Sequence, residues 1–208
     1  MLLRNLPAVI LLPLAVACGK SKSATTDTAA VITNIGRPQV DSGPANTVPM
    51  TFSLSSSAFD PNAAVPTKYT CEGANISPPL AWSGAPATAK SYALIVEDPD
   101  APDPAKPTRV VSHWVAYNIP ASATSLSENA SKKGMPAGSV QGSNDGNKQG
   151  YMGPCPPIGR HRYFFKLLAL DTTLTGLKNP KKADLEKAIH GHVVANAELI
   201  GTYQKTKK

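Results

Sequence analysis

The stretch YMGPCPPIGRHRYFFKLLALD, residues 151–171, joins two segments with different physical properties. The first, residues 153–159, has three prolines and two glycines and cannot form a helix, because proline lacks an amide donor and its φ is fixed. The second, residues 162–170, is a dense run of apolar and aromatic residues, as expected for a strand buried on both faces. The stretch therefore predicts a stiff loop that enters a central strand, with His161 and Arg162 at the junction.

Two further segments predict strands that carry acids and a histidine. Residues 91–98, SYALIVED, are typical of a strand, and DPDAP follows as a turn with two carboxylates, Asp98 and Asp100. Residues 111–119, VSHWVAYNI, predict another strand, which carries His113. The chain therefore offers two acids and two histidines beside buried strands, an arrangement from which binding sites are commonly built.

Each of these residues also has an ordinary structural interpretation. Aspartates such as Asp98 and Asp100 often cap backbone amides in a turn. A histidine on a strand face, such as His113, is by default a hydrogen-bonded core residue. Tyr151 and Tyr163 can equally be strand aromatics. The residue types alone therefore leave the site open.

The order of the motifs carries more information than any one of them. DPDAP, then HW in the next strand, then GPCPPIGRHRYFFKLLALD resemble the phosphatidylethanolamine-binding protein family, in particular its bacterial Raf-kinase-inhibitor-like branch. The resemblance extends from about Met50 to Tyr203 and includes YTCEGANISPPLAWSG and GHVVANAELIGTY. It implies a mainly β antiparallel sandwich, with a large sheet packed on a smaller one and one or two peripheral helices.

The composition agrees with this fold class. Many strand candidates with turn signals between them, twenty prolines and one late helix indicate an all-β sandwich with minor α structure. The helix is predicted over 181–191, and a long polar, glycine-rich loop over 121–150. The other expected elements are a short strand at 50–54, an extended segment at 77–82 and a last strand at 193–200.

The resemblance also implies a small anion pocket, with a cis peptide bond after Asp98. Imidazoles can donate to a phosphate, and Asp98 can fix the tautomer or raise the pKa of one histidine. Asp100 is expected mainly to hold the loop, and backbone amides near Gly153 and Cys155 are further candidate donors. The predicted ligand-binding residues are Asp98, Asp100, His113, Tyr151, Pro156, Pro157, His161 and Tyr163.

The N-terminus is predicted to be a targeting segment followed by a tether. Residues 1–18 have one early arginine, an apolar run too short to span a bilayer, and the ending LAVAC, which resembles a bacterial lipobox with lipidation at Cys18. A plain secretory signal is the alternative, because Ala15 stands where Leu or Val is more usual. Residues 19–48 are typical of a flexible tether, and 49–208 of the folded domain. We expect an exported protein, lipid-anchored in the outer membrane and facing the periplasm.

Two cysteines, Cys71 and Cys155, remain if Cys18 is lipidated. A pair of cysteines in an exported protein favours a disulfide, and the resemblance places both on loops near the same mouth of the sandwich. We therefore expect Cys71 and Cys155 to be bonded. The alternative is two thiols packed as small apolar residues.

The charge and the motifs limit the function. The formal net charge of +7 is scattered, which argues against nucleic-acid binding. No G-x-S-x-G, H-E-x-x-H or C-x-x-C motif supports a hydrolase or a metal site, and no cofactor motif is present. We expect a non-enzymatic protein that binds a small anionic ligand bearing phosphate or carboxylate. The alternatives are an interaction or inhibitor module that binds a cell-envelope protein, and a weak hydrolase.

Overall fold

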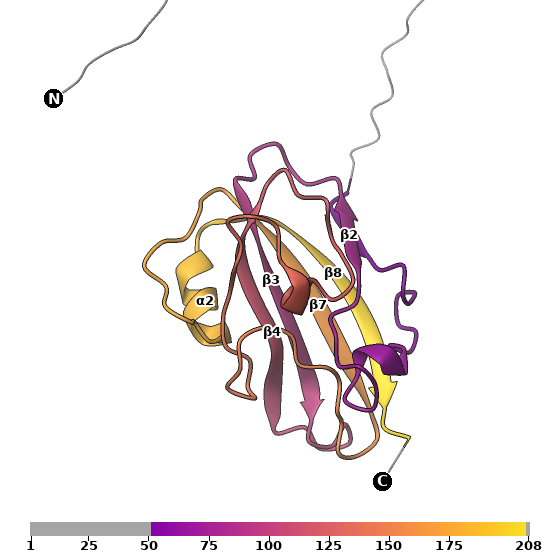
Figure 1. Ribbon diagram of the computed structural model, residues 1–208. Helices are drawn as coiled ribbons and strands as arrows, with labels where there is room; N and C mark the ends of the chain where they lie inside the picture. The colour runs from indigo at the N-terminus through magenta and orange to yellow at the C-terminus, as the bar shows by residue number, and fades with distance from the viewer. Residues whose placement is uncertain (1–50, 207–208) are drawn as a thin grey trace, which may run out of the picture. The chain divides into compact units, whose positions relative to one another are not determined.

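The structure, a computed structural model, describes residues 51–206 (Figure 1). The predicted signal segment at 1–18, the lipidation of Cys18 and the tether at 19–48 lie outside these residues. Within them, eight strands form two antiparallel sheets, accompanied by two short α-helices and one 3-10 turn. The prediction of a mainly β sandwich is confirmed.

The large sheet has five strands in the order β6-β4-β3-β7-β8. Each strand runs antiparallel to its neighbours. The central strand β3 pairs with β7 in a register that places Val96 opposite Phe165. The bounds are β3 Ser91–Ala101, β4 Arg109–Pro120, β6 Val140–Gln141, β7 Arg160–Leu170 and β8 Val193–Gln204.

The small sheet has three short strands in the order β1-β2-β5 and covers one face of the large sheet. The bounds are β1 Ser53–Ser55, β2 Leu80–Ser83 and β5 Ser125–Leu126. Leu80 and Trp82 of β2 are buried because alternate residues of a strand point to the same face. They join one core with Trp114 and Phe165 of the large sheet, both fully buried.

The opposite face of the large sheet is covered in part by α2 (Lys182–Ile189) (Figure 1). Leu185 and Ile189 pack with Ile95 and Val115 in a second, smaller core. The central strand β3 is therefore buried on both faces. No helix within residues 51–206 has the length and apolar composition needed to span a bilayer.

Besides shifts in the ends of other elements, the structure differs from the predicted elements in three places. Strand β3 does not end at Asp98 but continues to Ala101, because its backbone still pairs with β4 after a register shift. Strand β7 is not buried on both faces, since α2 leaves its outer side chains partly uncovered, and Phe164 lies there between Arg162 and Lys166. The predicted loop over 121–150 contains β5, β6 and a short helix, α1 (Ala130–Lys133).

A disulfide between Cys71 and Cys155 joins two distant parts of the chain. Cys71 follows the 3-10 turn η1 (Thr67–Tyr69), and its backbone amide donates to the carbonyl of Pro154 at 3.1 Å. Cys155 belongs to the proline-rich loop that precedes β7. The bond and the adjacent hydrogen bond therefore hold this loop against the η1 turn.

Glu97 links α2 to the large sheet through two ion pairs. Its carboxylate is buried in β3 and contacts the ammonium groups of Lys166 in β7 and Lys182 in α2. Burial raises the pKa of Glu97, but the hydrogen bonds from the two lysines outweigh it and hold that pKa below its ordinary value.

We expect Glu97→Gln to lower the free energy of unfolding at pH 7 by about 1–2 kcal/mol, the low end for charged hydrogen bonds because Lys166 is well exposed. The folded-state pKa of Glu97 lies below the unfolded value, so its contribution is complete above the unfolded pKa and is lost as the pH falls through the folded one. Lowering the pH below about 5 should therefore reduce the free energy of unfolding of the wild type more than that of the variant. Urea unfolding at a series of pH values measures this difference.

The control is Glu198→Gln, the same change at an exposed strand residue that makes no ion pair within residues 51–206. This variant should retain the acid sensitivity of the wild type. Parallel pH profiles for the wild type and Glu97→Gln would show that the ion pairs contribute nothing.

The disulfide predicts two thiols that become reactive only after reduction of the unfolded protein. Reductant should lower the free energy of unfolding of the wild type by about 2–4 kcal/mol, because the crosslink restricts the unfolded chain. The double variant Cys71→Ser/Cys155→Ser should have this lower stability with or without reductant. A wild type that is insensitive to reductant in denaturant titrations would contradict the prediction.

Candidate ligand-binding site

A cavity of about 190 Å³ lies at one end of the large sheet. Three segments supply its wall: the end of β3 with the residue that follows it (98–102), the start of β4 (109–113) and the loop 152–157. The antiparallel pairing of β3 and β4 brings the first two segments together, and the loop closes the cavity from the side of β7.

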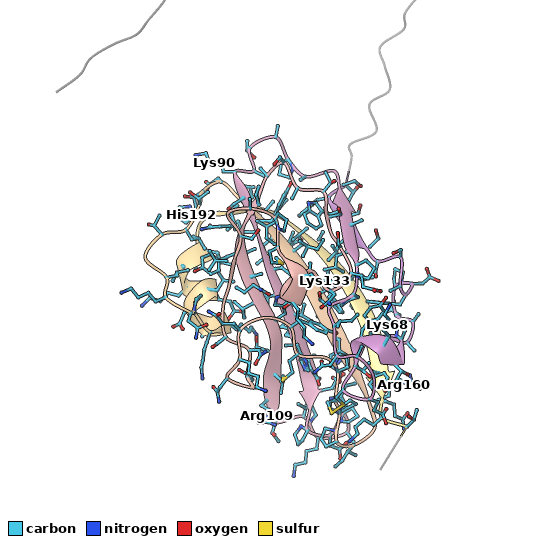
Figure 2. All side chains as sticks on the ribbon, in the orientation of Figure 1. Lys68, Lys90, Arg109, Lys133, Arg160 and His192 are labelled. Carbon is cyan, nitrogen blue, oxygen red and sulfur yellow. A yellow bond between two sulfur atoms is a disulfide. The ribbon has the colours of Figure 1, made fainter. Side chains whose placement is uncertain are left out.

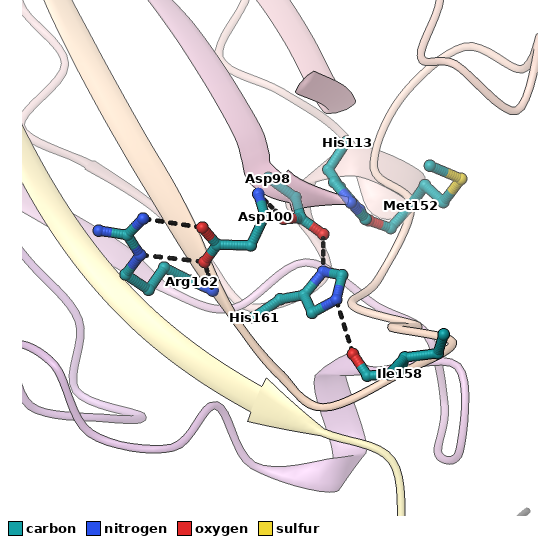
Figure 3. A network of polar contacts seen from close by, with 7 residues as sticks. All are labelled: Asp98, Asp100, His113, Met152, Ile158, His161 and Arg162. Carbon is teal, nitrogen blue, oxygen red and sulfur yellow. Dashed lines mark hydrogen bonds and ion pairs between the residues drawn. The ribbon is translucent and has the colours of Figure 1, made fainter. Parts of the chain in front are cut away.

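Asp98 and His161 form a buried pair beside this cavity (Figure 3). The Nδ1 atom of His161 lies 2.7 Å from Oδ2 of Asp98, and its Nε2 atom lies 2.9 Å from the carbonyl oxygen of Ile158. Both partners are oxygen acceptors, so the ring donates to both only as an imidazolium. His161 is fully buried and does not line the cavity, so it holds Asp98 and the loop and has no ring nitrogen left for a ligand.

Asp100 serves the same end of β3 in another way. Arg162 donates to its carboxylate from Nη2 at 2.7 Å, from Nε at 3.0 Å and from its backbone amide at 2.9 Å. The hydrogen bonds from Arg162 hold the pKa of Asp100 below its ordinary value. The Asp100 amide in turn donates to Oδ1 of Asp98 at 2.8 Å. Asp100 therefore orders the strand end and lies outside the cavity wall.

His113 lines the cavity from β4. Its Nδ1 atom lies 2.7 Å from the carbonyl oxygen of Met152 and donates to it. Burial lowers the pKa of His113 despite this hydrogen bond and the nearby Asp98, which favours the neutral ring. Its Nε2 atom then carries a lone pair and has no partner within residues 51–206, so it is the ring atom available to a ligand.

The two predicted tyrosines lie behind the site. Tyr163 is fully buried, and its ring packs edge-on against His113 with centroids 5.2 Å apart. The Tyr163 hydroxyl makes no hydrogen bond of normal geometry to any described residue. Burial, together with the charge of Asp98, raises the pKa of Tyr163. Tyr151 donates to the carbonyl of Tyr69 at 2.9 Å and packs on Trp114, away from the cavity.

The proline-rich loop forms the side wall. Pro156 and Pro157 line the cavity, as does Cys155 of the disulfide. The backbone amide of Gly153, predicted as a donor to an anion, instead donates to Oδ1 of Asn75 at 2.7 Å. A side chain at Gly153 would place its Cβ 2.5 Å from the carbonyl of Tyr69, so glycine is required for this close approach.

Two further details differ from the predicted site. The cis peptide bond expected after Asp98 lies instead between Ala101 and Pro102, the one such bond in the described part of the chain. Arg109, which was not predicted, lines the cavity and is exposed at the end of the domain seen in Figure 2. Alternate residues of a strand point to one face, so Arg109 shares a face with Val111 and His113. The sequence could have indicated Arg109 only if the predicted strand had begun at 109 and not at 111.

Arg109 has an uncompensated charge. None of the hydrogen bonds or ion pairs found among residues 51–206 involves its guanidinium, whereas Asp98 and Asp100 are both engaged elsewhere. In the same residues, no group of three or more His, Cys, Asp or Glu side chains is arranged to hold a metal ion. The wall thus combines acceptors, Asp98 and His113, with one free cation.

Known proteins are similar to this chain in sequence and in fold. The family model described as phosphatidylethanolamine-binding protein matches residues 55–204. A UPF0098 protein of Methanothermobacter thermautotrophicus is 51% identical over 155 residues, which are 74% of this chain and 99% of that protein. A UPF0098 protein of Chlamydia pneumoniae is 45% identical over 153 residues, with 74% and 99% covered.

Solved structures agree with these relatives. A Chlamydia trachomatis protein described as a phosphatidylethanolamine-binding protein homologue superposes with a TM-score of 0.68 at 42% identity, covering 75% of this chain and 99% of that one. Escherichia coli YbcL, described as a member of the mammalian family, gives a TM-score of 0.68 at 35% identity, covering 74% and 99%. The chain therefore belongs to the phosphatidylethanolamine-binding protein family.

Proposed function

We propose that this protein binds a small anionic ligand, bearing phosphate or carboxylate, without transforming it. The observation that carries the proposal is the cavity of about 190 Å³, whose stiff wall brings Asp98, His113 and Arg109 to one small space. A cavity of this size suits one small polar group and not a whole drug-sized ligand. Membership of a family named for binding supports a binding-type protein.

The arrangement of the histidines supports binding over hydrolysis. A hydrolase of the serine type needs a nucleophile within hydrogen-bond reach of a base. Among the residues that the structure describes, no serine or threonine lines the cavity, and Cys155 is held in the disulfide. His161 uses both ring nitrogens within the protein, and His113 uses one. We therefore infer that the site holds an anion and does not activate a nucleophile.

We also infer that the protein works in the cell envelope, lipid-anchored through Cys18 in the outer membrane and facing the periplasm. The disulfide between Cys71 and Cys155 supports an oxidising compartment. The leader-like residues 1–18 support export. A protein partner in the envelope would meet the same end of the domain.

Phosphate should stabilise the purified protein against heat. At a hundred times the dissociation constant, a ligand that binds only the folded state adds about 2.7 kcal/mol, or roughly 5–10 °C in melting temperature for a domain of this size. Val111→Phe should abolish this shift, because Val111 lines the cavity and a phenyl ring there would fill it.

Val110→Phe is the matched control, because Val110 is the preceding residue of β4, points to the opposite face and is 46% exposed. This variant should melt with the full phosphate-dependent shift. The proposed function fails if the wild type shows no shift in differential scanning calorimetry, or if Val111→Phe keeps it.

A further inference from the structure

We propose that the cavity selects oxyanions that still carry a proton, such as the monoanion of phosphate or of a phosphate monoester, and that Arg109 supplies the charge that binds them. Oxyanions with no proton at neutral pH, such as sulfate or a carboxylate, are then poor ligands. This inference rests on the proposed function and specifies the class of ligand that the same cavity accepts.

Arg109 is the one cationic side chain free to meet an anion in the described cavity wall. The other basic side chains nearby are engaged: Arg162 binds Asp100, and both ring nitrogens of His161 contact acceptors, Asp98 and the carbonyl of Ile158. The loop adds few amide donors, because three of its residues are prolines and the Gly153 amide already donates to Asn75. A guanidinium presents two parallel N–H donors, which match two oxygens of one phosphate.

The other polar side chains of the described cavity wall, Asp98 and His113, offer it hydrogen-bond acceptors. Each oxygen of Asp98 already receives one hydrogen bond, from His161 or from the Asp100 amide, and retains a lone pair. His113 donates to Met152 through Nδ1, so the Nε2 atom of its neutral ring is an acceptor. An oxyanion without a proton would place its own lone pairs against these acceptors and against the charge of Asp98.

A phosphate monoanion resolves this conflict. Its P–OH group can donate to His113 or Asp98, while two of its other oxygens accept from Arg109. Phosphate monoesters lose their second proton near pH 6, so this form is available under near-neutral conditions. A site built around acceptors rejects an analogue that lacks the donor, because its buried polar groups remain unpaired.

Equilibrium binding of inorganic phosphate and sulfate to the purified protein at pH 6.5 and constant ionic strength tests the selection. We expect phosphate to bind at least about tenfold more tightly than sulfate. Asp98→Asn keeps the size of the side chain but replaces one acceptor oxygen with an NH₂ donor, so it should reduce this ratio or reverse it.

The role of Arg109 is tested by two variants that each remove one positive charge and by a third that keeps it. Arg109→Gln should weaken phosphate binding at least about tenfold. Lys106→Gln removes the same charge from the exposed connection between β3 and β4, outside the cavity wall, and should change affinity less than twofold. Arg109→Lys keeps the charge without the fork and should fall between them.

The pH dependence reports the proton of the ligand. His113 faces Asp98, Asp145 and His161, and burial lowers its pKa, which favours the neutral ring increasingly as the pH rises from 6.5 to 8.5. Phosphate affinity should fall across this range as the ligand loses its proton, while sulfate affinity stays low. Affinity for phosphate that is constant or rises with pH would overturn the proposed selection.

The outcomes separate the two levels of the argument. A wild type that binds neither phosphate nor sulfate refutes the proposed function. A wild type that binds both equally, or an Arg109→Gln variant that behaves like Lys106→Gln, overturns the further inference and leaves anion binding in place.

Discussion

The buried pair of Asp98 and His161 is the interaction on which the cavity end of the large sheet depends. It joins the adjacent central strands β3 and β7 through two side chains that are both buried. A buried charge without a partner costs several kcal/mol, so each residue requires the other. His161 extends the constraint to the carbonyl of Ile158, and Asp98 extends it to the amide of Asp100. One pair thus orders a strand end and a loop at the same time.

The proline-rich loop before β7 shows how a segment without regular secondary structure can be held rigidly. Its prolines restrict φ but remove amide donors, so the loop is held through its carbonyl groups and its cysteine. His113 donates to the carbonyl of Met152, and His161 donates to that of Ile158. Cys155 is bonded to Cys71, which lies 84 residues earlier in the chain. Both site histidines therefore use the same loop as their acceptor. The geometry of the cavity and the position of the loop cannot vary independently.

The eight residues that the motifs predicted to bind a ligand divide into two groups in the structure. Four of the eight predicted binding residues face the cavity, namely Asp98, His113, Pro156 and Pro157. Others act from behind it: His161 holds Asp98, Asp100 holds Arg162, and Tyr163 packs under His113. The motifs thus contain residues that support the cavity wall as well as residues that line it. The cation of the wall, Arg109, lies outside the motifs and was found only from the position of its side chain.

The sequence by itself determined the fold class and the central strands, because alternating apolar residues and proline-rich turns act locally. The neighbourhood of the site and the closeness of the two cysteines came from the order DPDAP, HW and GPCPPIGRH and from the family that this order resembles. Only the tertiary structure decided which polar groups meet. The continuation of β3 past Asp98, the partial exposure of β7, the use of the Gly153 amide by Asn75 and the free charge of Arg109 all follow from long-range pairing. Such contacts join residues that are dozens of positions apart, and no local pattern specifies them.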